Sequence, residues 1–236
     1  MAPTLVLLHG FTQTRQSWRR TIAAIGGRHR AVAPDLPGHG HAAARPASFP
    51  ACTGYVRALG GERFALCGYS MGGRIALHAA LALGDRVERL ILVGASPGLA
   101  DPAEREARRA ADDALAARIE AIGMEAFARE WGAQPLFAGQ PERVAAAAHA
   151  DRLRNTPEGL GAALRGLGTG TMEPVWGRLG ELAIPVVLVV GERDEKFRAI
   201  AARMAAAIPR AEVRVIRDAG HAVQLERPEA VAAAIG

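Results

Sequence analysis

Short apolar runs alternate with helix-periodic segments along much of the chain. The predicted strands cover residues 4–8, 31–33, 64–67, 89–94, 185–190 and 212–216. Helical periodicity occurs at residues 18–25, 52–59, 75–83 and 197–208, and again from Pro228 onward. After Arg89, the run at residues 89–94 is unbroken in apolar character, as a parallel strand buried on both faces should be. The alternation predicts an α/β fold, with a mostly parallel sheet flanked by helices.

The pattern changes after the fourth predicted strand. From residue 101 to about residue 182 the chain is helix-patterned and charged, and it contains no convincing strand. Glycines and prolines interrupt this segment at Gly123, Pro135, Pro141 and Pro157. We therefore expect an α/β core formed by residues 1–98 and 183–236, with a helical cap at residues 99–182 inserted into it. A chain of 236 residues is long enough for such an arrangement.

Composition and charge exclude several classes of protein. The net charge of +5 suggests a nucleic-acid partner, but there is no basic block, and aromatic residues make up only 5% of the chain. No apolar run is long enough for a membrane helix, and no signal-peptide pattern precedes the first strand. Cys52 and Cys67 form neither a C-x-x-C pair nor a disulfide framework. We expect a cytoplasmic protein without a metal, a cofactor, or a nucleic-acid or membrane partner.

The predicted strand at residues 64–67 leads into a G-x-S-x-G pattern, Gly68 to Gly72, and then into a helix. A serine on so sharp a turn needs small neighbours, and the turn presents its hydroxyl group above the sheet. The N–H of Met71, at the start of the helix, would face negative charge that develops beside Ser70. We interpret this segment as a nucleophile elbow; a purely structural glycine-rich turn is the alternative.

A second candidate donor lies after the first strand, in the sequence His9-Gly10-Phe11. In folds with a nucleophile elbow, the loop after this strand supplies a backbone N–H to the oxyanion hole. We therefore predict that the N–H groups of Phe11 and Met71 form that hole.

Two later loops complete a candidate catalytic triad. Asp194 and His221 each follow a predicted strand, and the order Ser70, Asp194, His221 is that of α/β-hydrolase triads. His221 would take the serine proton, and Asp194 would orient the imidazole ring. The alternatives are a helix N-cap for Asp194 and a turn residue for His221. Asp218 is a rival acid, although it lies on the same loop as His221.

Arginines accompany these residues. Arg74 lies one helical turn after Ser70, which suits the binding of an anionic ligand better than a structural salt bridge. The predicted cap carries further arginines that could face the same pocket. A simpler interpretation of Arg108 is an i,i+4 ion pair with Glu104 on a solvated helix face. The cap candidates are Arg105, Arg108, Arg109, Arg152 and Arg154.

Several stretches together resemble the α/β-hydrolase-fold synthases of menaquinone biosynthesis that make 2-succinyl-6-hydroxy-2,4-cyclohexadiene-1-carboxylate. GYSMGG and AGH are common to many α/β-hydrolases, whereas QPLF, LRGLGTG and GERDEKF are far more specific. The matching stretches are HGF (9–11), DLPGHG (35–40), GYSMGGRIAL (68–77), ASPGL (95–99), WGAQPLF (131–137), RLRNTPEGL (152–160), LRGLGTG (164–170), GERDEKF (191–197), AGH (219–221) and LERP (225–228).

The resemblance implies a lyase that expels pyruvate from a substrate with several carboxylates. Ser70, activated by His221, would then abstract a carbon-bound proton, and no acyl-enzyme would form. The resemblance also assigns substrate binding to particular side chains. These are Arg74, Arg108, Arg152, Tyr69 and Trp131.

The chain departs from the family pattern in three places. We expect the hairpin before the first strand to be absent or minimal. The segment between Gly40 and Gly68 is short, and Gln224 stands where relatives often carry a histidine. The alternative function is a carboxylesterase of the same fold that acts on small esters, and a non-catalytic binding protein is a third. We expect a small anionic substrate and a monomer or small homo-oligomer.

Overall fold

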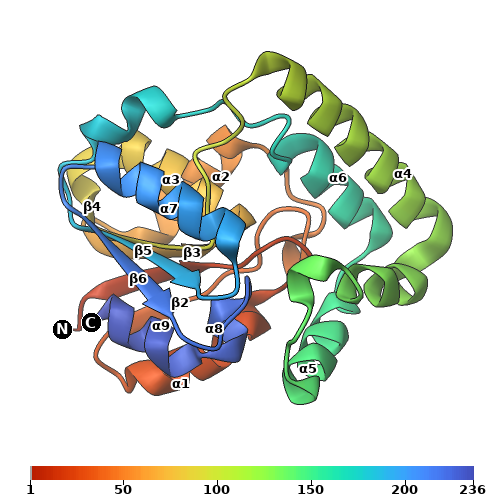
Figure 1. Cartoon of the computed structure of the whole chain (residues 1–236), viewed down its shortest axis with the longest axis horizontal. Helices are drawn as coiled ribbons and strands as arrows, with labels where there is room; N and C mark the ends of the chain where they lie inside the picture. The colour runs from red at the N-terminus through yellow and green to blue at the C-terminus, as the bar shows by residue number, and fades with distance from the viewer. Residues whose placement is uncertain (1) are drawn as a thin grey trace.

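The computed structural model describes residues 2–236 and contains one sheet of six parallel strands (Figure 1). The strand order is β2-β1-β3-β4-β5-β6, so the chain starts inside the sheet and builds outward in both directions. The strands are β1 (Thr4–Leu8), β2 (Arg30–Val32), β3 (Phe64–Tyr69), β4 (Val87–Val93), β5 (Val186–Gly191) and β6 (Ala211–Ile216). The α/β prediction is confirmed, and each predicted strand agrees with the observed one to within about two residues.

Strand β3 extends further than the apolar pattern indicates. Gly68 pairs with Leu92 and Tyr69 with Val93, so the ladder to β4 continues to the residue before Ser70. The sequence pattern ended this strand at Cys67 because a glycine and a tyrosine interrupt the apolar run. The extension places Ser70 directly at the carboxyl end of a central strand.

Helices cover both faces of the sheet (Figure 1). One face packs against α1 and α9 through a buried cluster that includes Leu5, Leu7 and Trp18. The opposite face packs against α2, α3 and α7 through a larger cluster that includes Leu66, Ile75 and Met204. The helices outside the insertion are α1 (Arg19–Ile25), α2 (Phe49–Gly60), α3 (Met71–Leu83), α7 (Glu195–Ala207), α8 (Val223–Glu226) and α9 (Pro228–Ile235).

A helical insertion separates β4 from β5 and lies beyond the carboxyl ends of the strands (Figure 1). It consists of α4 (Pro102–Gly132), α5 (Glu142–Arg152) and α6 (Pro157–Leu167), and α4 bends at Gly123, where φ is 73°. The insertion has its own apolar cluster, which includes Phe127 and Leu160. Phe11 packs against both this cluster and that of the sheet. We call this insertion the cap; its exact limits at residues 99–182 stay a prediction.

None of the helices within residues 2–236 combines the length and the apolar character that a membrane crossing requires.

The elbow depends on the absence of a side chain at position 72. A Cβ at Gly72 would lie 2.3 Å from the carbonyl oxygen of Leu8 and 2.5 Å from that of His9. Because both neighbours are backbone atoms, we expect Gly72→Ala to lower the free energy of unfolding by about 1–3 kcal/mol in urea titrations. Gly54→Ala is the control, since its Cβ would meet no atom within 4 Å in the middle of α2. It should raise stability by about 0.5–1 kcal/mol; equal stability for Gly72→Ala and the wild type would contradict this account.

Candidate active site

Ser70 occupies the tight turn between β3 and α3. Its φ of 50° and ψ of −109° are strained for a residue with a side chain. Its backbone N–H donates to the carbonyl of Val93 at 2.9 Å, and its own carbonyl accepts from the N–H of Arg74 at 3.0 Å. These bonds on either side hold the strained residue, with its side chain half-buried at the head of α3.

The structure brings the three predicted triad residues together. Nε2 of His221 lies 3.2 Å from Oγ of Ser70, and Nδ1 of His221 lies 2.6 Å from Oδ2 of Asp194. His221 and Asp194 are both buried. A hydroxyl hydrogen-bonded to an imidazole that is oriented by a buried carboxylate is the arrangement that activates a serine.

Asp194 fits both interpretations that the sequence allows. Its Oδ1 accepts the backbone N–H of Phe197 at 3.2 Å and so caps α7, while its Oδ2 faces His221. The rival acid, Asp218, is exposed and lies 3.7 Å from Arg227 instead. The N-cap therefore fixes the carboxylate in the rotamer that His221 requires.

Close packing leaves the imidazole little freedom to rotate. The rings of Phe197 and Tyr69 lie 4.5 Å and 5.3 Å from that of His221, measured between ring centroids. A Cβ at Gly94 would come within 3.0 Å of Cε1 of His221, and φ at Gly94 is 56°, so both space and backbone conformation favour glycine there.

An ion pair between exposed Arg193 and buried Glu226 supports the loop that carries His221. The buried carboxylate of Glu226 accepts from the N–H of Gly220 at 2.8 Å and from Nη2 of Arg193 at 2.9 Å. The N–H of Arg193 also donates to the carbonyl of Ala219. Arg193 and Glu226 thus join the loop of Asp194 to that of His221. The sequence reasoning assigned them no role, although both lie in motifs that resemble the synthases, GERDEKF and LERP.

The loop after β1 leaves one backbone donor free. In the segment from Gly10 to Thr14, every N–H except that of Phe11 has an acceptor within the described residues. Met71 is the first residue of α3, so its N–H has no acceptor inside the helix. Both residues line the same cavity as Ser70. This arrangement makes the two N–H groups available to an oxyanion.

The cavity next to Ser70 has a volume of about 500 Å³, within the usual range for a small-molecule site. It lies between the carboxyl ends of the strands and the cap, with Trp131 and Leu164 contributed by the cap. All but one of the predicted catalytic and oxyanion residues line this cavity. Those that do are Ser70, His221, Phe11 and Met71, and the exception is Asp194.

Arg74 lines this cavity and has few partners of its own. Its Nη2 donates to the carbonyl of Leu167 at 2.8 Å, and its Nε has no partner. Within residues 2–236, no carboxylate lies within ion-pair distance of it. Burial lowers the pKa of Arg74 to about 10, and nearby Arg108 acts in the same direction. At neutral pH Arg74 is therefore a half-buried cation without an ionic partner among the described residues, which suits an anion-binding residue.

Arg108 also lines the cavity, but its ion pair differs from the expected one. Its Nε donates to Oδ1 of Asp112 at 2.8 Å, so the predicted pairing with Glu104 is wrong. Both acids lie four residues from Arg108, on opposite sides along the helix. The buried position of Asp112 decides between them, because a buried carboxylate needs a cation more than an exposed one does.

The other predicted binding residues divide into two groups. Trp131 lines the cavity, and its ring lies 5.3 Å from that of Phe11. Arg152 and Tyr69 do not line it: Arg152 is buried with its guanidinium 5.3 Å from the Phe137 ring, and Tyr69 is buried behind His221. Burial raises the pKa of Tyr69 and lowers that of Arg152. The remaining candidates among the cap arginines also lie outside the cavity lining; they are Arg105, Arg109 and Arg154.

Among residues 2–236, no group of three or more histidine, cysteine or acidic side chains is placed so that it could hold a metal ion.

Comparisons with known proteins point to the same superfamily. Residues 5–234 match the model of the Alpha/beta hydrolase family. A putative 2-succinyl-6-hydroxy-2,4-cyclohexadiene-1-carboxylate synthase of Bacillus subtilis is 36% identical over 235 residues, which cover 95% of this chain and 85% of that protein.

Two solved structures are similar over nearly the whole chain. MenH from S. aureus superposes with a TM-score of 0.92 at 32% identity, covering 100% of this chain and 92% of that one. A malate-bound thermophilic esterase from Thermogutta terrifontis superposes with a TM-score of 0.82 at 30% identity, covering 99% and 88%.

Proposed function

The chain belongs to the α/β-hydrolase family and, within it, to the 2-succinyl-6-hydroxy-2,4-cyclohexadiene-1-carboxylate synthases, and on this basis we propose its reaction. The protein is a lyase that eliminates pyruvate from 2-succinyl-5-enolpyruvyl-6-hydroxy-3-cyclohexene-1-carboxylate, a step of menaquinone biosynthesis.

The change in the ring defines what the site must do. The substrate has one ring double bond, at carbon 3, and the product has two, at carbons 2 and 4. A proton therefore leaves carbon 2, the double bond shifts, and the bond from carbon 5 to the enolpyruvyl oxygen breaks. Negative charge develops on the succinyl ketone oxygen next to carbon 2, because that carbonyl is conjugated with the carbanion.

Ser70 and His221 supply the proton transfers. As Oγ of Ser70 takes the proton from carbon 2, its own proton passes to Nε2 of His221, 3.2 Å away. Asp194 stabilises the imidazolium through the contact at 2.6 Å. The imidazolium then protonates the departing enolate, which becomes pyruvate, and both residues return to their starting states.

The N–H groups of Phe11 and Met71 would receive the developing oxyanion. Their availability in the cavity beside Ser70 supports this role. Donors fixed in advance stabilise such charge without reorganisation, which makes this term large in enzymes of this fold.

The single observation that carries the proposal is the half-buried Arg74, which has no ionic partner among the described residues and lines the same cavity as Ser70. A substrate carboxylate would complete its hydrogen bonding, and Arg108 and Trp131 line the same space. We also retain Arg152 and Tyr69 as binding residues, which requires that they approach the substrate when it is bound.

The alternative is a carboxylesterase, which the intact triad and the similarity to an esterase favour. A coupled assay for pyruvate release from the enolpyruvyl substrate separates the two, with p-nitrophenyl acetate as the competing substrate. We expect rapid pyruvate release and slow ester hydrolysis; brisk ester hydrolysis without pyruvate release would overturn the proposal.

Three further properties complete the proposal. The substrate is a small anion, the protein acts as a monomer or small homo-oligomer, and it acts in the cytoplasm. The two free cysteines, Cys52 and Cys67, are buried and fit a reducing compartment.

A further inference from the structure

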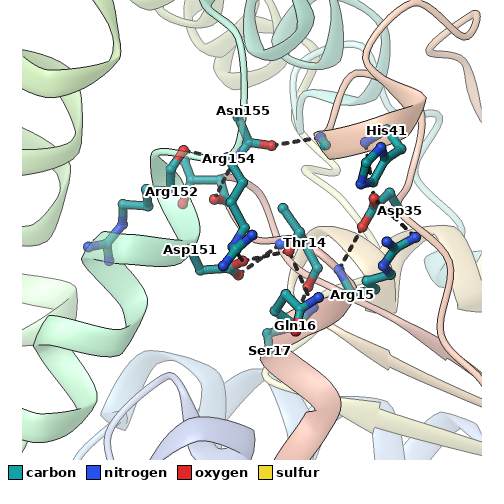
Figure 2. A network of polar contacts seen from close by, with 12 residues as sticks. Thr14, Arg15, Gln16, Ser17, Asp35, His41, Asp151, Arg152, Arg154 and Asn155 are labelled. Atoms are coloured by element: carbon teal, nitrogen blue, oxygen red, sulfur yellow. Dashed lines mark hydrogen bonds and ion pairs between the residues drawn. The ribbon is translucent and has the colours of Figure 1, made fainter.

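A group of buried hydrogen bonds joins the cap to the loop that follows β1. We call it the cap–loop clamp: Asp151 and Asn155 on the cap side, Thr12 and Thr14 on the loop side. Figure 2 shows the two cap residues on either side of Arg152, facing the loop. All four clamp residues are buried, and their partners are more than 100 positions away along the chain.

Asp151 binds Thr14 twice. Its Oδ2 accepts the backbone N–H of Thr14 at 2.9 Å, and its Oδ1 accepts the hydroxyl of Thr14 at 2.5 Å (Figure 2). Charge-assisted bonds of this length are stronger than neutral ones. Arg154 lies 3.8 Å from the same carboxylate, but its side chain is 61% exposed, so solvent weakens that ion pair.

Asn155 holds the loop at Thr12. Its Nδ2 donates to the carbonyl of Thr12 at 2.8 Å, and its Oδ1 accepts the N–H of Gly40 at 3.1 Å. The N–H of Thr12 donates in turn to Nε2 of His39 at 3.3 Å. Burial lowers the pKa of His39 to about 3, so its imidazole is neutral at physiological pH and can accept this bond.

Thr12 needs these supports because its backbone is strained. Its φ is 69°, which is unfavourable for a β-branched residue. Such a conformation persists only where the surroundings determine it, and here the bonds to Asn155 and His39 do so from two sides. The N–H of Phe11 lies in the preceding peptide bond, whose carbonyl, that of Gly10, accepts the N–H of Gln13 at 3.2 Å. The bonds to Thr12 hold the next peptide bond, so they constrain the backbone of Phe11 from its other side.

The clamp also reaches the cap arginine that the family resemblance assigns to binding. Nδ2 of Asn155 donates to the carbonyl of Arg152 at 3.0 Å as well as to that of Thr12. One amide group therefore ties the backbone of a cap residue to that of the loop.

We propose that Asp151 and Asn155 are positioning residues that set the Phe11 N–H of the oxyanion hole from the cap. This inference rests on the proposed function. The cap then has a second task besides covering the cavity: the oxyanion hole has its working geometry only while the cap holds Thr12 and Thr14.

The test uses isosteric variants of the full chain in the pyruvate-release assay. Asn155→Asp keeps the shape and the acceptor but loses the donor to Thr12, and Thr14→Val keeps the shape but loses the hydroxyl bond to Asp151. We expect kcat to fall by about 10- to 100-fold in each, because a misplaced oxyanion donor loses transition-state stabilisation. KM and the dissociation constant of the product should change by less than about threefold.

Arg154→Ala is the matched control, because it removes the exposed partner of Asp151 and leaves the clamp intact; its kcat should equal that of the wild type. Thermal unfolding identifies a clamp variant that fails to fold. If either Asn155→Asp or Thr14→Val does so, the kcat of the one that folds tests the inference. Unchanged kcat in a folded clamp variant overturns the inference, as does a rise in KM at constant kcat, which would indicate a role in binding alone. Absence of pyruvate release by the wild type would instead refute the proposed function.

Discussion

Asp194→Asn should lower kcat for pyruvate release by about 10³- to 10⁴-fold and leave the fold intact. The carboxylate does two things at once: Oδ2 orients His221, and Oδ1 caps α7 through the N–H of Phe197. Asparagine is as good an N-cap as aspartate, so the helix should keep its start. Its amide would instead donate to Nδ1 of His221 and select the tautomer that cannot accept the serine proton. Steady-state pyruvate release and thermal unfolding measure the two effects separately.

Two further variants make this prediction specific. Asp194→Ala removes the N-cap of α7 as well, so it should lose similar activity and, in addition, about 1 kcal/mol of stability. Asp218→Asn should leave kcat unchanged, because that carboxylate is exposed and lies beside Arg227. If Asp218→Asn abolished activity and Asp194→Asn did not, the assignment of the acid would be wrong.

The sequence predicts the elbow and the triad well because each member has a local signal. Ser70 lies in a strand-turn-helix pattern, and Asp194 and His221 each lie in the loop after a strand whose place in the sheet follows from the alternation. Parallel strands bring their carboxyl ends to one edge, so order along the chain was enough to expect these three residues to meet.

Contacts between the cap and the core have no such local signal. Thr14 and Asp151 are 137 residues apart, and nothing in either neighbourhood indicates the other. The choice of Asp112 over Glu104 as the partner of Arg108 likewise depends on burial, since both acids have the same spacing. The resemblance marked Arg152 and Tyr69 as binding residues, but it could not indicate that both lie outside the lining of the cavity.

Arg74→Met should lower kcat/KM for the enolpyruvyl substrate by about 10- to 150-fold, the usual range for losing a charge-assisted hydrogen bond. Methionine fills a similar space, so the loss of packing should be small. Hydrolysis of p-nitrophenyl acetate, which carries no charge for Arg74 to bind, should change by less than about threefold. The kcat/KM of Arg74→Lys should lie between those of the wild type and Arg74→Met, because an ammonium group keeps the charge but cannot form the planar pair of hydrogen bonds to a carboxylate.

Comparing the two substrates distinguishes a loss of anion binding in Arg74→Met from a general loss of fold. Arg143→Met removes the same charge from an exposed position on α5, outside the lining of the cavity, and should alter neither reaction. A general loss of fold would reduce both reactions, whereas loss of an anion-binding residue reduces only the one with an anionic substrate. Equal decreases in both activities, in a protein that unfolds at the wild-type temperature, would mean that Arg74 supports the elbow rather than the substrate. The role of the cavity as a carboxylate site would then have to rest on Arg108.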